Sequence, residues 1–264
     1  MHAKKAIGIL GGVGPEAGVC LEHYILEETR KQNHPQSDQE HIQTFHLSCP
    51  DMISDRSTYL NFKNSDAPNP AEGAIEVMEL FEVMAAHQHE ELYVGIPCNT
   101  FHAAKIFQKL EALMSDKHLD HLHLINMIEE TGKAIKEKFS HMHKIGLIST
   151  TGTREAKIYH DILIPMGFEV IEVSVSEQHK VHDTIYNLSW GIKSGMHNKE
   201  KTRKNMLAFV DVLIQQGAES IILGCTEIPL VLTELHIQTV PLIDPMRILA
   251  ERLVHNATEK TGQS

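Results

Sequence analysis

Short aliphatic runs, most of them next to glycine, alternate along this chain with longer stretches in which apolar residues recur at helical spacing. The first run, residues 5–11 (KAIGILG), is apolar on both faces, which is typical of a strand buried in a parallel sheet. Further strands are predicted at residues 40–50, 91–97, 143–150, 168–175 and 219–224. Because parallel strands are joined by long crossovers, usually helices, the alternation predicts an α/β fold.

Helices are predicted in the stretches between these strands. The first follows a glycine turn, and Pro15 suits the opening turn of a helix. Residues 154–167 are predicted as one helix closed by Gly167, after a turn at residues 151–153. Other helices are predicted at residues 69–90, 103–114 and 202–217.

The order of elements repeats in the second half of the chain. Residues 6–15 (AIGILGGVGP) correspond to residues 144–153 (KIGLISTTGT), and in each half a later strand ends at a cysteine followed by polar residues. We therefore predict two similar α/β lobes, each with a mostly parallel central sheet flanked by helices. The first lobe would comprise residues 1–123 and 241–264, and the second residues 124–240.

Composition and charge argue against several classes of protein. A chain of 264 residues, 42% of them hydrophobic, can bury a substantial core. The formal net charge of −11 repels nucleic acid and anionic lipid, and no stretch approaches the roughly 20 apolar residues that cross a bilayer. Glycines and Pro15 interrupt the N-terminal apolar run, so we do not expect a secretory signal. Four cysteines without close pairing indicate reduced thiols and a cytoplasmic location.

Two of the cysteines come directly after predicted strands, Cys98 in VGIPCNT and Cys225 in IILGCTE. Open α/β sheets bind ligands at the carboxyl ends of their strands, and backbone N–H groups there favour a thiolate. Three interpretations remain open. The cysteines are small buried hydrophobes, Cys98 is a covalent nucleophile with His102 as its base, or one sulfur removes a proton from carbon while the other returns a proton to the opposite face.

A series of motifs in order along the chain resembles the aspartate/glutamate racemases, which are independent of pyridoxal phosphate. The motifs are IGILGGVGPEA, DRSTYL, PCNTFHA, MIEET, GLISTTGT, GAESIILGCTEIPL and VPLIDP, and they run almost from end to end. The resemblance implies two lobes related by a pseudo-two-fold axis, an active site between them, and catalytic cysteines at Cys98 and Cys225. It also implies a small amino-acid substrate, no cofactor and a homodimer.

The same resemblance implies a set of substrate-binding residues. Arg56 in DRSTYL matches the arginine that grips the substrate side-chain carboxylate, a role that suits the planar guanidinium fork. Lys193 in GIKSG matches a second basic residue in the other lobe. The remaining residues of the predicted set are Val13, Asn99, Thr100, Thr151, Thr153, Thr226 and Glu227. Val13 and Phe101 stand where the family commonly has Met and Ala, and these differences bear on the choice of substrate.

Two other signals are weaker. Residues 12–17 (GVGPEA) match a dinucleotide-binding fingerprint, but the proline does not suit that turn and no acidic residue clearly ends a second strand. Nineteen histidines include several close pairs, yet these lack the cysteine or carboxylate spacing of a zinc site, so we expect no metal.

The sequence therefore predicts an isomerase, a cofactor-independent amino-acid racemase that acts on aspartate, glutamate or both by proton transfer between two cysteines. Two alternatives from other classes remain. One is a one-thiol isomerase or lyase acting on a small dicarboxylate, and the other is a non-catalytic amino-acid-binding protein of the same fold.

Overall fold

The computed structural model describes residues 4–60, 67–194 and 198–259. The chain divides into two compact units. One comprises Met1–Glu130 with Met246–Ser264, and the other comprises Thr131–Pro245. Both borders lie a few residues further along the chain than those predicted from the sequence.

The first unit is built on a four-stranded parallel sheet with the strand order β2-β1-β3-β4. Its strands are β1 (Lys4–Gly11), β2 (Thr44–Ser48), β3 (Glu90–Gly95) and β4 (Leu122–Ile125). The central strand β1 is buried from its third residue to its end, as its apolar sequence predicted. This sheet is covered on both faces, which is what a parallel sheet requires.

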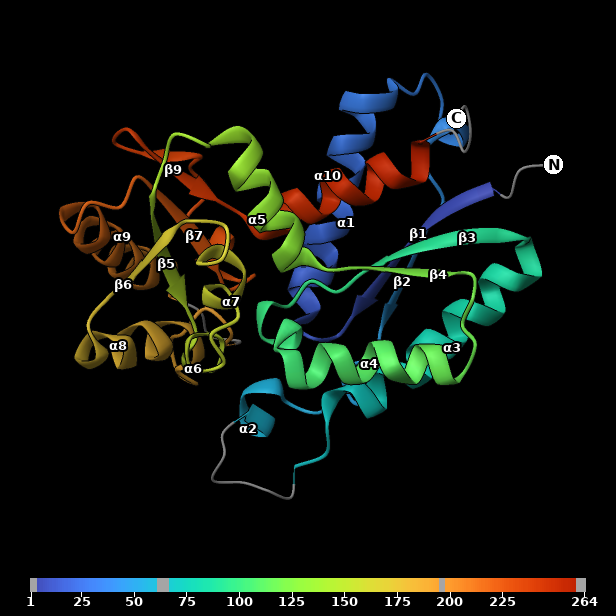
Figure 1. Cartoon of the computed structure of the whole chain (residues 1–264), viewed down its shortest axis with the longest axis horizontal. Helices are drawn as coiled ribbons and strands as arrows, with labels where there is room; N and C mark the ends of the chain where they lie inside the picture. Colours follow the sequence, from blue (N-terminus) through green and yellow to red (C-terminus); the bar gives the residue numbers. More distant parts are fainter. Residues whose placement is uncertain (1–3, 61–66, 195–197, 260–264) are drawn as a thin grey trace. The chain divides into compact units, whose positions relative to one another are not determined.

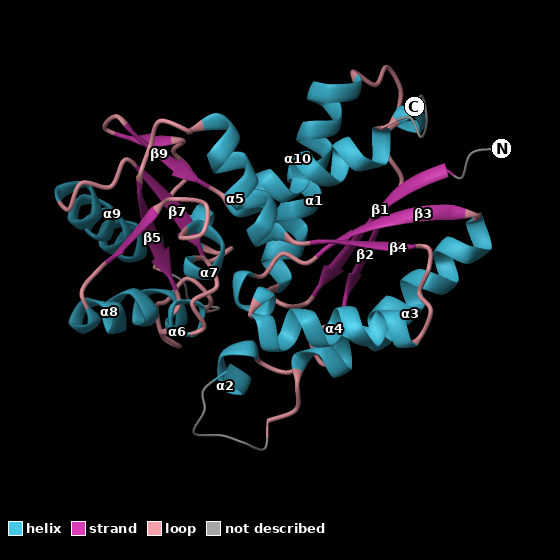
Figure 2. Ribbon diagram, in the orientation of Figure 1, coloured by secondary structure: helices cyan, strands magenta, loops and turns pink. Residues whose placement is uncertain are grey.

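Long helices cover the first sheet. Figure 2 shows α1 (Pro15–Asn33) and α10 (Pro245–Thr258) on one face, and α3 (Pro70–Gln88) and α4 (Ala104–Asp116) on the other. α10, the last helix of the chain, lies beside α1 (Figure 1), and Arg247 joins the two by an ion pair to α1. Shorter helical segments in the same unit are η1 (Asp38–Glu40), α2 (Arg56–Leu60) and η2 (Asn99–His102).

The second unit has a five-stranded sheet with the strand order β6-β5-β7-β9-β8. The parallel strands are β5 (Lys144–Ser149), β6 (Glu169–Glu172), β7 (Ser220–Gly224) and β9 (Val240–Ile243), and the short β8 (His236–Ile237) is antiparallel. The first four strands in this order follow the same pattern as the four strands of the first unit. The prediction of two similar α/β lobes with mostly parallel sheets is therefore confirmed.

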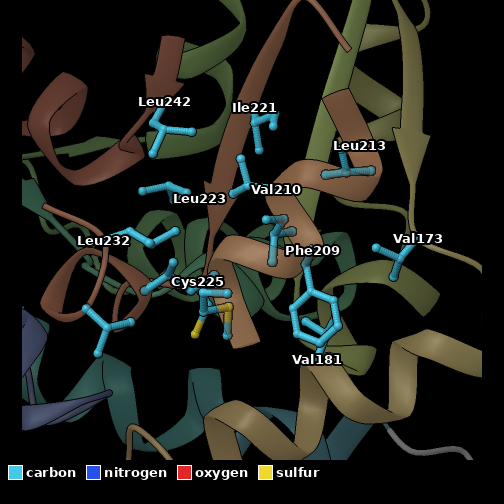
Figure 3. Packing of buried hydrophobic residues seen from close by; sticks show 14 of the residues in the cluster. Val173, Val181, Phe209, Val210, Leu213, Ile221, Leu223, Cys225, Leu232 and Leu242 are labelled. Atoms are coloured by element: carbon cyan, nitrogen blue, oxygen red, sulfur yellow. The ribbon is translucent and has the colours of Figure 1, made fainter. Parts of the chain in front are cut away.

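Helices of the second unit enclose a compact apolar core. α8 (Val175–Tyr186) and α9 (Lys199–Gln215) pack against each other and against β5. α6 (Thr151–Glu155) and α7 (His160–Leu163) follow β5, the three-residue η3 (Ile228–Leu230) follows β7, and α5 (Met127–Lys138) spans the border between the units. Figure 3 shows the packing of these buried side chains, and Cys225 is one of them.

The sequence prediction failed around residues 151–167. The predicted turn at 151–153 is instead the start of α6, because the Thr150 side chain caps the helix by accepting the Thr153 N–H. The single helix predicted for 154–167 is broken in two. Lys157 has a φ of +53°, in the left-handed region, where a helix cannot continue. The strand predicted for 168–175 ends early, since Ser174 caps α8.

The glycine turn after β1 generates a prediction about stability. Gly12 has a φ of +82°, and a Cβ atom built on it would lie 2.6 Å from the backbone nitrogen of Pro50. Gly167 has a comparable φ of +94° but open space around the same position. Gly12→Ala should therefore lower the free energy of unfolding of its unit by about 3 kcal/mol, and Gly167→Ala by about 1 kcal/mol.

Hydrogen-exchange mass spectrometry at increasing urea concentration would measure both changes, because it follows each unit separately. Equal decreases in the free energy of unfolding in the two variants would show that the close approach of Pro50 to Gly12 does not affect stability.

Candidate functional site

In the first unit, the glycine turn and Cys98 lie at the same edge of the sheet. β1 and β3 are neighbouring parallel strands, with Ile9 opposite Gly95, so the residues that follow them leave the sheet at its carboxyl edge. Cys98 is only 7% exposed, and its N–H donates to the carbonyl of Ile96 at 2.8 Å. The structure thus places Cys98 and the turn containing Val13 together at the edge where the sequence predicted a site.

The segment after Cys98 differs from the expected helix start. Asn99 and Thr100 lie in the short η2 segment, and α4 begins only at Ala104. Both polar side chains are buried, and η2 packs against α2, whose first residue is Arg56. Two predicted substrate-binding residues and the predicted carboxylate-binding arginine therefore stand on neighbouring elements.

Arg56 is held against the glycine turn. Its Nη2 donates to the carbonyl of Val13 at 2.9 Å, and its Nη1 makes a longer bond of 3.4 Å to the carbonyl of Ser54. Both bonds orient the guanidinium against the backbone of the glycine turn and of the segment before α2. The planar fork of a guanidinium held in this way matches the geometry of a carboxylate.

His102 does not have the free nitrogen that a general base for Cys98 would need. Its Nδ1 lies 2.8 Å from the carbonyl oxygen of Cys98, and its Nε2 accepts the N–H of Met127 at 3.2 Å. Burial lowers the pKa of His102 to about 4, although the bond to the Cys98 carbonyl acts in the other direction. The one-thiol interpretation loses the base that the sequence offered for it.

In the second unit, the TTGT segment and Cys225 share a sheet edge in the same way. β5 and β7 are neighbours, with Ser149 opposite Gly224. Thr153 is buried, and its hydroxyl lies 3.1 Å from the hydroxyl of Thr150. Thr151 is less buried, and its N–H faces His182 Nδ1 at 3.4 Å.

Cys225 belongs to a hydrogen-bonded network with a buried charge. Its thiol donates to Glu227 Oε2 at 3.0 Å, and the Thr226 hydroxyl donates to the same oxygen at 3.2 Å. The other carboxylate oxygen of Glu227 pairs with Lys193 Nζ. The structure thus joins four of the residues selected from the sequence, and Cys225 itself is 5% exposed.

This network sets the protonation of its members. Burial, followed by the negative charge of Glu227, raises the pKa of the Cys225 thiol well above its usual value. Burial also works against the charge on Glu227, but Lys193 and the bonds from Cys225 and Thr226 outweigh it, so the pKa of Glu227 is lowered. Burial opposes the charge on Lys193 as well, yet facing Glu227 raises its pKa overall. At neutral pH Cys225 is therefore a thiol facing an ion pair.

A buried tyrosine that the sequence did not select, Tyr159, interacts electrostatically with Cys225. Burial raises the pKa of Tyr159 well above its usual value, and the charges of Asp244 and Cys225 add to the effect. Tyr159 precedes α7, and Asp244 follows β9, the neighbour of β7. The VPLIDP motif contained Asp244, but Tyr159 carried no recognisable signal.

Two features are absent from the described residues. In the parts of the chain that the structure describes, no helix is long and apolar enough to cross a membrane. Those parts also contain no group of three or more His, Cys, Asp or Glu side chains placed to hold a metal ion. Several histidines instead pair with single glutamates, as His121 does with Glu82 and His123 with Glu91.

Comparisons with known proteins agree with this architecture. The Asp/Glu/hydantoin racemase family model matches residues 10–253. The broad specificity amino-acid racemase RacX of Bacillus subtilis (strain 168) is 25% identical over 252 residues, or 94% of this chain and 96% of that protein. An uncharacterized protein in the pnlA 3'region of Pectobacterium carotovorum subsp. carotovorum is 36% identical over 118 residues, 45% of this chain and 73% of that one.

Solved structures show the same fold. The Picrophilus torridus aspartate racemase has a TM-score of 0.75 and 21% identity, and the match covers 97% of this chain and 95% of that one.

The network around Cys225 predicts a change in thiol reactivity. Glu227→Gln removes the negative charge beside the sulfur but leaves Lys193 in place, so the pKa of Cys225 should fall. Alkylation of Cys225 by iodoacetamide, followed by peptide mass spectrometry across a pH series, should then begin at lower pH than in the parent protein.

Glu234→Gln is the matched control, since Glu234 pairs with Arg203 in the same unit and is not part of this network. It should leave the Cys225 profile unchanged. An unchanged or upward-shifted profile in Glu227→Gln would show that the carboxylate does not govern this thiol.

Proposed function

We propose that this chain, which belongs to the Asp/Glu/hydantoin racemase family and is an isomerase of the amino-acid racemase type, interconverts the L and D forms of aspartate or glutamate with two cysteines as its acid and base. The observation that carries the proposal is the thiol of Cys225, buried and hydrogen-bonded to Glu227. A cysteine that is protonated at neutral pH can act as an acid toward a substrate carbon.

The proposed reaction balances without a redox step. The thiolate of Cys98 takes the α-proton, and the electron pair of the broken C–H bond is delocalised into the adjacent α-carboxylate. The thiol of Cys225 then gives its proton to the opposite face of Cα and becomes a thiolate. Cys98 ends as a thiol, so the reverse reaction uses the same two groups in exchanged roles.

Two of the predicted substrate-binding residues, Arg56 and Lys193, are cationic. Arg56 is the proposed partner of the substrate side-chain carboxylate, because backbone carbonyls orient its guanidinium fork. Lys193 stays in the proposed substrate-binding set, but Glu227 already balances its charge.

Polar groups around the two cysteines are proposed to hold the rest of the amino acid. Asn99 and Thr100 follow Cys98, and Thr226 follows Cys225, so polar residues adjoin each cysteine along the chain. Thr151 and Thr153 belong to the capped segment at the neighbouring strand end. Such fixed dipoles would stabilise the charge that develops as the α-proton leaves.

Three further features are part of the same proposal and rest on the family resemblance and on the unpaired cysteines. They are activity without a cofactor, a homodimeric assembly and a cytoplasmic location. The alternatives to a two-thiol racemase are a one-thiol isomerase or lyase and a non-catalytic binding protein. The bonds made by both nitrogens of His102 weigh against the first alternative.

Racemisation without a cofactor is the first test. The purified protein, treated with hydroxylamine to remove any carbonyl cofactor, should convert either enantiomer of aspartate or glutamate to the racemate, as measured by chiral chromatography. Arg56→Lys should raise KM for the preferred acidic substrate more than it lowers kcat, since a lysine cannot supply the bidentate fork.

The proposed function would be wrong if no amino acid in a complete panel were inverted by the well-folded protein. Inversion of neutral amino acids at the rate found for aspartate and glutamate would contradict only the acidic-substrate assignment.

Both cysteines should be needed for inversion. Cys98→Ala and Cys225→Ala should each lower kcat by about 100-fold or more, because each removes one of the two proton-transferring groups. Chiral chromatography of each variant with each enantiomer measures the loss. Cys20→Ala, at a half-buried position on α1, is the matched control and should retain the parent rate. Parent activity in the Cys225→Ala variant would eliminate the two-base mechanism.

A further inference from the structure

His102 links two backbone groups through one side chain. A carbonyl oxygen only accepts hydrogen bonds, so the 2.8 Å contact between His102 Nδ1 and the Cys98 carbonyl requires a proton on Nδ1. A backbone N–H only donates, so the 3.2 Å contact from Met127 requires a lone pair on Nε2. The two bonds together are compatible with the neutral, Nδ1-protonated tautomer alone.

The surroundings of the ring keep it in this state. His102 is buried, and its ring stacks on Phe107 with the centroids 4.9 Å apart and the planes 22° from parallel. Burial lowers its pKa to about 4, so the ring is neutral at physiological pH. A buried, neutral ring that makes both of its hydrogen bonds is a fixed spacer between the groups that it contacts.

One of those groups is the peptide that carries the candidate catalytic thiol. The Cys98 carbonyl also accepts the N–H of Phe101 at 3.2 Å, and the Cys98 N–H donates to Ile96 at 2.8 Å. Those two bonds are local to the turn. The bond to His102 is different, because the ring continues to Met127, the first residue of α5.

We propose that His102 is a positioning residue that fixes Cys98 by donating a hydrogen bond from Nδ1 to its carbonyl group, while the bond from Met127 at the start of α5 holds the imidazole in the tautomer that can donate it. Both ring nitrogens of His102 are bonded to backbone groups, so we assign the ring no proton exchange with the sulfur. The consequence for catalysis rests on the proposed function, in which Cys98 is one of the two proton-transferring thiols. The structural link itself does not depend on that function.

The geometry suggests substitutions that cut the link at one end only. The amide nitrogen of Asn occupies nearly the place of Nδ1, so His102→Asn can still donate to the Cys98 carbonyl but does not reach Met127. The amide oxygen of Gln lies near the place of Nε2, so His102→Gln can still accept from Met127 but releases Cys98. His102→Leu removes both bonds and keeps the position apolar.

Two measurements on these variants test the proposal. The first is the rate of alkylation of Cys98 by iodoacetamide at one pH, resolved by peptide mass spectrometry and divided by the rate for Cys225 in the same sample. Release of the turn should expose the buried thiol and raise this ratio about 5-fold in His102→Leu and His102→Gln, since one buried hydrogen bond is worth about 1 kcal/mol. His102→Asn should stay within about 2-fold of the parent protein.

The second measurement is racemase kinetics. A misplaced proton-transfer group should lower kcat by about 10-fold or more in His102→Gln with a smaller change in KM, because the other binding groups are untouched. His102→Asn should recover most of the activity lost in His102→Leu. A parent protein without racemase activity would contradict the proposed function, whereas the alkylation ratio would still test the link between His102 and Cys98.

Phe107→Leu is the matched control for a loss of packing at the same place. It removes the stacked ring but neither hydrogen bond, so the protein should become less stable while the alkylation ratio stays at the parent value. Nitrogen NMR of labelled protein supplies a direct signature. The His102 resonances, identified by their absence in His102→Asn, should be those of a neutral ring protonated at Nδ1.

Several results would overturn the proposal. An alkylation ratio that is unchanged in all three His102 variants would mean that the ring does not restrain Cys98. Equal behaviour of the Asn and Gln variants, or a ring protonated at Nε2, would contradict the assignment of the bonds. If His102→Leu does not fold, the comparison of Asn with Gln decides the question.

Discussion

The buried negative charge of Glu227 is the interaction on which the rest of the candidate site depends. A carboxylate out of water is costly unless a cation and hydrogen-bond donors compensate it, and here Lys193, Thr226 and Cys225 do so. The thiol is one of the donors, so Glu227 holds the sulfur in place, and burial together with the charge of Glu227 raises the pKa of Cys225 and keeps it protonated. The arrangement joins a loop that follows β7 to one that follows α8, and it explains why a polar cluster sits at the edge of an apolar core.

A second constraint comes from the topology of the two sheets. Each unit has two central neighbouring strands, and the segments after both of them meet at the carboxyl edge. In the first unit this brings the glycine turn with Val13 close to Cys98, and Arg56 is bonded to that turn. In the second it brings the capped TTGT segment close to Cys225. The repeated strand order, more than any single motif, accounts for the recurrence of a cysteine at equivalent places in the two halves.

Features of the fold and the site that depend on local sequence could be predicted, whereas features that depend on contacts between distant residues could not. The strands and the positions of both cysteines could be predicted, because an apolar run next to glycine is a local signal. The break between α6 and α7 could not be predicted, because it occurs at Lys157, which adopts a left-handed conformation although it is neither glycine nor next to a glycine or proline. The pairing of Lys193 with Glu227 and the bond from His102 to Met127 were also missed, since tertiary structure creates both contacts.

Deuterium exchange distinguishes two different sulfurs that serve the two faces of the substrate carbon from a single base that serves both. A single enantiomer of the preferred substrate would be incubated with the protein in heavy water. The two enantiomers would be separated early in the reaction, and the deuterium content of each would be measured by mass spectrometry. The two-thiol mechanism predicts deuterium at Cα of the inverted product while the recovered starting enantiomer keeps its protium, because the returned proton comes from the second thiol. Deuterium appearing equally in both enantiomers from the start would indicate one exchanging base and would contradict the two-thiol mechanism.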